Sequence, residues 1–278
     1  MDVSAADLKR LREKTGAGML DCRNALVKAE GDFARAERLL KEQGLAAAAK
    51  KSGRATSAGK IFVKNQAGKA VVLELDCETD FVVRNDLFRS LGAALVELVA
   101  AKGLTAPTDE MKLLVNEAIG KIKENMALAR FTTITAGPDE LLVDYVHDDR
   151  IGVVVKAKVD AKIAANPAVK QTLFDCALHL AAFAPQFLSR EKVPADWLKE
   201  QESIFQEQVK AMDKPANVLQ GIVKGKVSKL LSEVCFLEQP FVKDEKRKVA
   251  KVLEDLGKQV GGTVAAVDFV YYRVGEAA

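Results

Sequence analysis

The feature that most constrains the fold is a pattern that occurs twice, in which two strand-like runs flank a turn and an apolar helix follows. The first copy starts at residues 61–76, IFVKNQAGKAVVLELD, and the second at residues 141–160, LLVDYVHDDRIGVVVKAKVD. Runs of β-branched residues around a turn predict a β-hairpin in each copy. When Val71 is aligned with Val153, the helical patterns that follow also align to within one residue. The repeat predicts an α+β core made of two pseudo-symmetric halves.

The first part of the chain has a helical period instead. Apolar residues recur three or four positions apart in three short runs, which glycines separate. Ser4 and Asp32 are suited to cap the first and third helices. A basic stretch without apolar period follows at residues 46–60, AAAAKKSGRATSAGK. Because no aromatic residue interleaves its charges for base stacking, a solvated linker is favoured over an RNA-binding tail.

A third pattern, close to heptad spacing, separates the second helix of the repeat from the last β-rich run. Trp197 and Ile204 lie seven residues apart, and a three-four alternation of apolar residues resumes after Pro215. Two helices joined by a short turn at residues 213–215 predict an antiparallel hairpin that projects from the core. The pattern does not decide whether this arm binds a partner or packs on its own core.

These patterns divide the chain into a three-helix module, two core halves and an arm. Another helix is predicted at residues 109–130, and the β-rich run at 263–274 is predicted to add an edge strand to the second half. The expected segments are the N-terminal module at 1–52, the first core half at 53–140, the second half at 141–192 and 236–278, and the inserted arm at 193–235.

Composition excludes several classes of function. Lys and Arg number 42 against 39 Asp and Glu, so the net charge of +3 carries no strong nucleic-acid signature. The four cysteines form no C-x-x-C pair and only two histidines are present, which disfavours a zinc site. The N-terminus lacks a signal-peptide pattern, and no apolar run approaches the roughly 18 residues that span a bilayer. A cytoplasmic location with reduced thiols is therefore expected.

Four carboxylates crowd around one phenylalanine in residues 76–86, DCETDFVVRND. They could form a metal site or an acid pair, but the D-x-D-x-D-G spacing of a calcium loop is absent and a solvated loop that starts a helix is favoured. No nucleophile motif accompanies them, so neither an enzyme nor a cofactor is expected. Phe81 either packs under its own helix or faces solvent as a wedge for a partner, and the pattern leaves both open.

Five stretches together resemble one known family. They are LREKTGAGMLDCRNAL at 11–26, ETDFVVRND at 78–86, HDDRIGV at 147–153, QPFVKD at 239–244 and FVYYRVGE at 269–276. In this order they resemble the bacterial elongation factor Ts family, the guanine-nucleotide exchange factors of elongation factor Tu. The resemblance spans nearly the whole chain, and several of its motifs are specific.

The resemblance implies a function for the residues that match. The N-terminal module is similar to a ubiquitin-associated (UBA) domain and is expected to dock on the nucleotide-binding domain of elongation factor Tu, a GTPase. His147 is expected to line a neighbouring pocket in the second core half, and the helical hairpin corresponds to a coiled-coil arm. The residues implied for docking of the module are Arg12, Met19 and Leu20.

The T-D-F-V stretch carries the implied mechanism. Thr79, Asp80, Phe81 and Val82 resemble a loop that pushes against the GTPase helices beside the nucleotide, displaces the elements that hold Mg²⁺ and releases GDP. No catalytic residue, own metal, membrane or direct nucleic-acid contact is expected. Self-association through the core or the arm is left open. The rival hypotheses are an RNA- or ribosome-binding protein that uses Lys50, Lys51 and Arg54, and an acid/base or Mg²⁺-dependent enzyme.

Two departures from the family pattern limit what the resemblance implies. Family members commonly read F-V-R-F-x-V-G-E-G and continue into a C-terminal helix that touches the partner, whereas this sequence reads FVYYRVGEAA at its end. The resemblance therefore does not carry the contacts of that helix over to this sequence. In addition, HDDRIGV places two acids after His147, where H-G-x-R-I-G-V is usual.

Overall fold

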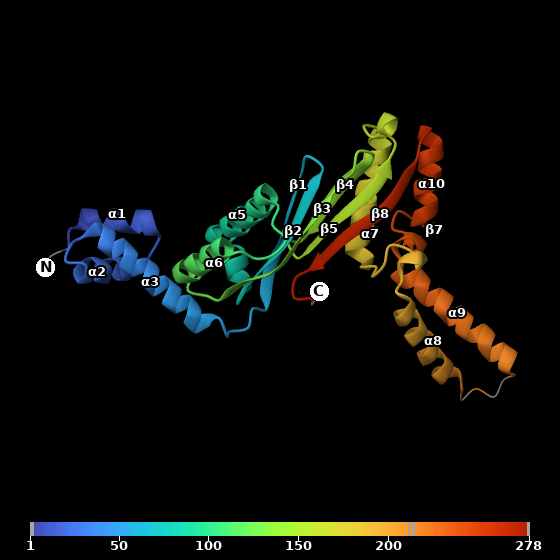
Figure 1. The fold of residues 1–278 in the computed structure, drawn as a ribbon, viewed down its shortest axis with the longest axis horizontal. Coiled ribbons are helices and arrows are strands. Elements are labelled where there is room, and N and C mark those ends of the chain that lie inside the picture. Colours follow the sequence, from blue (N-terminus) through green and yellow to red (C-terminus); the bar gives the residue numbers. More distant parts are fainter. Residues whose placement is uncertain (1–2, 211, 213–214, 277–278) are drawn as a thin grey trace.

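The computed structural model describes residues 3–210, 212 and 215–276, and it confirms the predicted α+β class. Two three-stranded antiparallel sheets form the centre, in the orders β1-β2-β3 and β4-β5-β8. They pack face to face through a buried cluster that includes Ile61 and Val72 from one sheet and Val154 from the other. Helices cover the outer face of each sheet (Figure 1). The core is thus a helix–sheet–sheet–helix arrangement.

The first sheet is built around a buried central strand. Strand β2 (Lys69–Cys77) pairs with β1 (Ala58–Gln66) on one side and with β3 (Met126–Thr135) on the other. Its run of buried residues suits a strand covered on both faces. Helices α5 (Asp86–Lys102) and α6 (Asp109–Ile122) cover the sheet, and the four-residue α4 (Asp80–Val83) lies between β2 and α5.

The prediction of one helix over residues 109–130 is wrong in its last part. Helix α6 ends at Ile122, Lys123 adopts the left-handed conformation with φ of 68°, and β3 begins at Met126. Residues 126–130, MALAR, are good helix formers, but pairing with β2 overrides that local preference. The first sheet therefore has a third strand, and its connection to α6 lies at residues 123–125.

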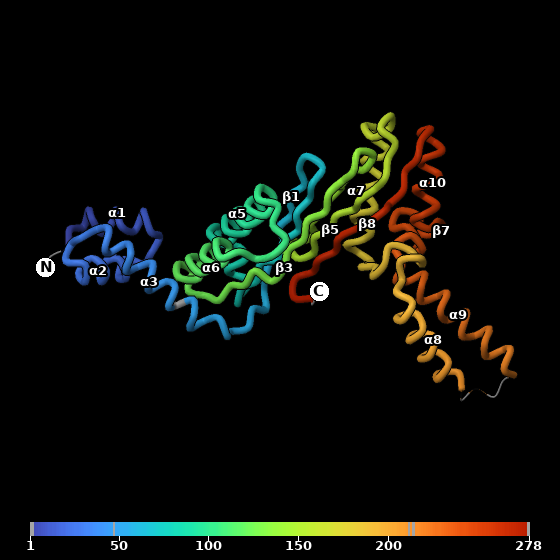
Figure 2. The backbone as a smooth tube through the Cα atoms, viewed as in Figure 1, coloured from blue at the N-terminus to red at the C-terminus, as the bar shows by residue number. Residues whose placement is uncertain are grey.

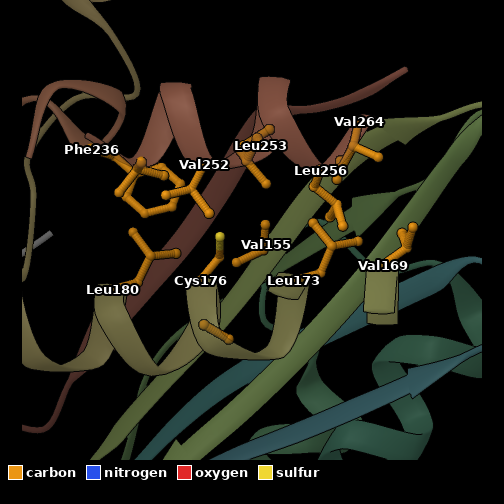
Figure 3. Packing of buried hydrophobic residues seen from close by; sticks show 14 of the residues in the cluster. Val155, Val169, Leu173, Cys176, Leu180, Phe236, Val252, Leu253, Leu256 and Val264 are labelled. Carbon is orange, nitrogen blue, oxygen red and sulfur yellow. The ribbon is translucent and has the colours of Figure 1, made fainter. Parts of the chain in front are cut away.

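The second sheet also consists of a hairpin and a third strand covered by helices, and it has a larger buried cluster. Strands β4 (Glu140–His147) and β5 (Ile151–Val159) form a hairpin, and β8 (Val264–Arg273) pairs with β5 as the predicted edge strand. Helices α7 (Pro167–Phe183) and α10 (Val249–Val260) cover it (Figure 3). The smaller elements are η1 (Ala161–Ile163), η2 (Arg190–Lys192), η3 (Phe236–Glu238), β6 (Pro240–Phe241) and β7 (Asp244–Lys248).

The N-terminal helices have their own small apolar core. Helices α1 (Ala5–Thr15), α2 (Met19–Lys28) and α3 (Phe33–Lys51) pack around Leu11 and Leu26. The chain runs from the end of α3 through a short connection into β1 (Figure 2). Gly44 on α3 and Gly120 on α6 face each other so closely that a Cβ on Gly120 would lie 2.9 Å from the Cα of Gly44. This glycine contact sets how near α3 can approach the core.

Helices α8 (Ala195–Lys210) and α9 (Ala216–Val234) pack along each other and extend away from the two sheets (Figure 1). Val209 from α8 and Val223, Val227 and Leu231 from α9 are buried in the cluster between them. Of the turn predicted at residues 213–215, positions 213 and 214 lie outside the described residues. At its base, α9 ends at Val234, next to η3.

Candidate functional site

The loop that follows β2 presents an aromatic side chain to solvent. Phe81 is 79% exposed, although the strand before it is buried along almost its whole length. The question that the sequence left open is therefore answered, because Phe81 does not pack under its own helix. Exposure of a large aromatic ring loses the free energy of burial that this side chain would gain inside the core. Aromatic side chains are enriched in protein interfaces, so this exposed ring on a short, anchored loop is a candidate interaction site.

Residues on either side of Phe81 anchor the loop. Val82 is 6% exposed and belongs to the buried cluster of the first core half. Asn85 caps α5 by accepting a hydrogen bond from the Leu87 backbone N–H at 2.8 Å. The Cys77 thiol donates to the Thr79 carbonyl oxygen at 3.2 Å. In this conformation Val82, which the resemblance placed among the partner-binding residues, faces the core and acts as an anchor.

A polar network joins the start of the loop to two other segments. The Thr79 hydroxyl donates to the Glu124 carboxylate, with distances of 3.0 and 3.1 Å to its two oxygens. Glu78 accepts a hydrogen bond from the Asn125 backbone N–H at 2.6 Å. The Asn125 side-chain amide donates to the Arg54 carbonyl oxygen at 2.7 Å, and its side chain is 4% exposed. The connection between α6 and β3 thus holds the base of the loop.

The carboxylates of the acidic cluster do not converge. Asp76 points into the core, and burial, followed by the nearby charge of Glu74, raises its pKa to about 7. Glu78 is engaged by Asn125, while Asp80 and Asp86 are exposed. Within the described part of the chain, no group of three His, Cys, Asp or Glu side chains is arranged to hold a metal ion.

The other residues implied by the resemblance lie on separate surfaces. Met19 and Leu20 begin α2 and are 44% and 67% exposed, and Arg12 on α1 is also exposed. His147 ends β4, where its Nδ1 lies 3.0 Å from the Tyr145 hydroxyl and its Nε2 lies 3.4 Å from an Asp148 carboxylate oxygen. Met19 and Leu20 belong to the N-terminal helices, Phe81 to the first core half and His147 to the second.

Two of the three basic residues of the RNA-binding hypothesis, Lys51 and Arg54, make contacts within the chain. Lys51 donates to the Lys123 carbonyl oxygen, and a guanidinium nitrogen of Arg54 lies 3.5 Å from a Glu78 carboxylate oxygen. Lys51 and Arg54 therefore each have a partner within the chain, although the Arg54 side chain stays 56% exposed. Among the described helices, none is long and apolar enough to cross a membrane.

Sequence reasoning missed Glu124 and Asn125. Both follow a helix whose end was placed too late, and their partners Thr79 and Glu78 lie some 45 residues earlier in the chain. The only local signal is a polar pair, Glu-Asn, between a helical pattern and a strand. Such a pair is also typical of an ordinary loop, so the network could not be found without the fold.

Comparison with known proteins shows which family this sequence is similar to. The sequence model of the family described as Elongation factor TS matches residues 78–276. Elongation factor Ts of Treponema denticola is 44% identical over 277 residues, which cover 99% of both chains. The Treponema pallidum protein of the same name is 38% identical over 288 residues, with the same coverage of both chains. That of Borrelia hermsii is 37% identical over 278 residues, 99% of this chain and 100% of the relative.

These matches define a translation elongation factor, a class of protein whose work is done through contact with other macromolecules. The chain belongs to the elongation factor Ts family. Membership in this family implies a nucleotide exchange factor for elongation factor Tu in translation elongation.

Proposed function

We propose that this chain binds elongation factor Tu in its GDP-bound state and promotes GDP release without making or breaking a covalent bond. The observation that carries the proposal is the exposure of Phe81 on a loop that is held by the buried Val82 and by the hydrogen bonds of Thr79. Buried aromatic anchors contribute much of the binding energy of protein interfaces. We therefore assign Phe81 to insertion into the GTPase. We place this interaction in the cytoplasm.

The proposed action is to disturb the Mg²⁺ and phosphate site of elongation factor Tu. In this proposal Asp80 and Phe81 press on the helices beside the nucleotide and move the groups that hold Mg²⁺. The cation offsets the negative charge of the diphosphate, so its displacement weakens GDP binding. Thermodynamic linkage then requires that the exchange factor bind nucleotide-free elongation factor Tu more tightly than the GDP complex, by the same factor.

We infer three further contact regions. The first is the exposed start of α2 with Met19 and Leu20, joined by Arg12, in an N-terminal module that we regard as UBA-like. The second is the surface around His147, and the third is the arm formed by α8 and α9. Because these regions belong to different parts of the chain, each can add affinity without touching the nucleotide site.

The direct test is release of labelled GDP from elongation factor Tu. The unmodified chain should accelerate release at micromolar concentration, and Phe81→Ala should lower this acceleration on the order of tenfold or more, as expected for loss of an aromatic anchor. Phe183→Ala is the matched control, since Phe183 is 53% exposed at the end of α7 in the other core half. No acceleration by the unmodified chain would end the proposal, and equal losses in the two variants would remove the special role of Phe81.

A binding measurement separates the partner from the mechanism. In size-exclusion chromatography the chain should form a stable complex with nucleotide-free elongation factor Tu, and excess GDP should dissolve it. A complex that persists in excess GDP would show binding without the linkage that exchange needs.

A further inference from the structure

The loop that carries Phe81 is too short to hold its own conformation. Helix α4 has four residues, and such a helix is unstable alone because too few hydrogen bonds offset the fixed backbone. The Phe81 ring adds little packing, since it is 79% exposed. The direction in which this ring leaves the core must therefore be set by contacts made on either side of it.

We propose that Glu124 is a positioning residue for nucleotide exchange, because its carboxylate holds Thr79 and so fixes the direction of Phe81. The inference rests on the proposed function and adds a residue outside the T-D-F-V stretch. Glu124 follows α6 in the chain and does not belong to the loop. Its contact with Thr79 joins two segments that are separated by 45 positions.

The Thr79 hydroxyl is used in an unusual way for its position. Thr79 is the N-cap of α4, with φ of −131° and ψ of 155°, and a threonine there ordinarily accepts a hydrogen bond from a backbone N–H of the first turn. No such bond is formed by this side chain. Its hydroxyl instead donates to both Glu124 oxygens, at 3.0 and 3.1 Å. A hydrogen bond to a charged acceptor is stronger than one between neutral groups.

Glu124 is itself held in place by its neighbours. Lys123 has φ of 68° and closes α6 as a left-handed cap, with its N–H donating to the Ile119 carbonyl oxygen. On the other side, Asn125 is 4% exposed and bonds through its backbone to Glu78 and through its side chain to Arg54. The carboxylate of Glu124 is therefore carried on a fixed piece of backbone. The acceptor of the Thr79 hydrogen bond is therefore itself fixed in position.

A pre-positioned ring favours exchange because less conformational freedom is lost when it inserts into a partner. Without the Glu124 contact, α4 and Phe81 sample more orientations. The orientation that can insert into the partner is then present in a smaller fraction of the free molecules. The lowered fraction reduces apparent affinity and exchange in the same proportion. Loss of one hydrogen bond to a charged group corresponds to a change on the order of tenfold.

The experiment is a double-mutant cycle on stimulated GDP release from elongation factor Tu. Glu124→Ala and Phe81→Ala are measured singly and together, with circular dichroism and thermal melting of each variant. Glu124→Ala should lower exchange on the order of tenfold in the unmodified background and have little effect in the Phe81→Ala background, because there is no ring left to position. Glu110→Ala, which removes an exposed carboxylate at the other end of α6, should leave exchange unchanged.

Two conservative variants test the hydrogen bond itself. Glu124→Gln keeps an oxygen that accepts from Thr79, so it should restore most of the exchange lost in Glu124→Ala. Thr79→Val keeps the shape of Thr79 without its hydroxyl and should resemble Glu124→Ala. These variants distinguish a specific contact from the general effect of changing the loop.

The outcomes separate this inference from the proposed function. If the unmodified chain does not accelerate release, the proposed function fails and the inference fails with it. If Phe81→Ala loses exchange while Glu124→Ala does not, the function stands and the positioning role is overturned. Equal losses from Glu124→Ala in both backgrounds would also overturn it, since that result describes general destabilisation.

Discussion

The two halves of the core are built alike, but they bury different polar groups. In the first half, Glu74 and Asp76 on β2 are 1% and 8% exposed and lie beside Arg130 on β3. In the second half, His179 on α7 has no exposed surface. One half therefore encloses charge, and the other encloses a neutral ring.

The charged centre joins the two sheets. The Arg130 Nε lies 2.7 Å from a Glu74 oxygen, and the other Glu74 oxygen accepts from the Gly275 backbone N–H at 2.6 Å. A guanidinium nitrogen of Arg130 also donates to the Arg273 carbonyl oxygen at 3.0 Å. Arg273 ends β8 and Gly275 follows it, so the ion pair of the first sheet is hydrogen-bonded to the end of the second sheet.

The neutral centre joins α7 to the base of the arm. The Val242 backbone N–H donates to Nδ1 of His179 at 3.1 Å, so the ring proton is on Nε2, which donates to the Gln239 side-chain oxygen at 2.8 Å. The Gln239 amide in turn donates to the carbonyl oxygen of Glu233, near the end of α9. Burial lowers the pKa of His179 and keeps the ring uncharged.

The largest expected effect on stability comes from removing Arg130, the partner of the buried Glu74 carboxylate in the first half. Arg130→Ala should lower the free energy of unfolding by about 3–5 kcal/mol, because Glu74 would stay buried and unpaired. Urea denaturation at pH 7 measures this. Arg247→Ala removes an exposed arginine that also pairs with a carboxylate and should leave the midpoint unchanged. If the two variants had similar urea midpoints, the buried ion pair would contribute no more to stability than an exposed one, and the prediction would be wrong.

A smaller difference in stability is expected between alanine substitutions at two glycines, one in a helix of each core half. A Cβ on Gly257 of α10 would lie 2.7 Å from the Gly262 carbonyl oxygen, whereas one on Gly92 of α5 would meet the far end of the Phe62 ring. Backbone yields less readily than a ring, so Gly257→Ala should cost about 1–3 kcal/mol and Gly92→Ala less. Thermal melting of both variants compares them, and a larger loss in Gly92→Ala would reverse this order.

The smallest expected effects are opposite responses to pH. Burial raises the pKa of Asp76 above its ordinary value to about 7, so stability that this group provides below about pH 4 is lost as pH rises towards 7. The pKa of His179 is lowered, so its contribution is complete above about pH 6.5 and is lost as pH falls through the folded-state value. The contribution of Asp76 to stability thus decreases as pH rises, whereas that of His179 decreases as pH falls.

Urea midpoints between pH 5 and pH 8 check both signs. Asp76→Asn should remove the loss at high pH and stabilise the chain there by about 1–2 kcal/mol, while His179→Gln should flatten the loss at low pH. Each variant serves as the control for the other, because each should leave the opposite limb of the profile in place. Unchanged profiles in both variants would assign the pH response to other groups.

The predictable parts of this molecule are those that local chemistry decides. The repeated pattern predicts the α+β class, and Ser4 and Asp32, which were expected to cap the first and third helices, are the N-caps of α1 and α3. Strand β3 was missed because its first residues favour a helix until β2 is available to pair with them. The direction of Phe81 and the role of Glu124 depend on contacts between distant segments, which a pattern of neighbours does not contain.

The bond between Glu74 and Gly275 has a consequence for how the chain is made. A ribosome releases residue 74 long before residue 275, and these two positions are 201 apart. Until the last strand emerges, the Arg130–Glu74 pair lacks both of the backbone partners that the second sheet supplies. Domains that form mainly from local contacts fold early, whereas such distant contacts form late. The bonds that this pair makes to the second sheet can therefore form only after residue 275 has been synthesised.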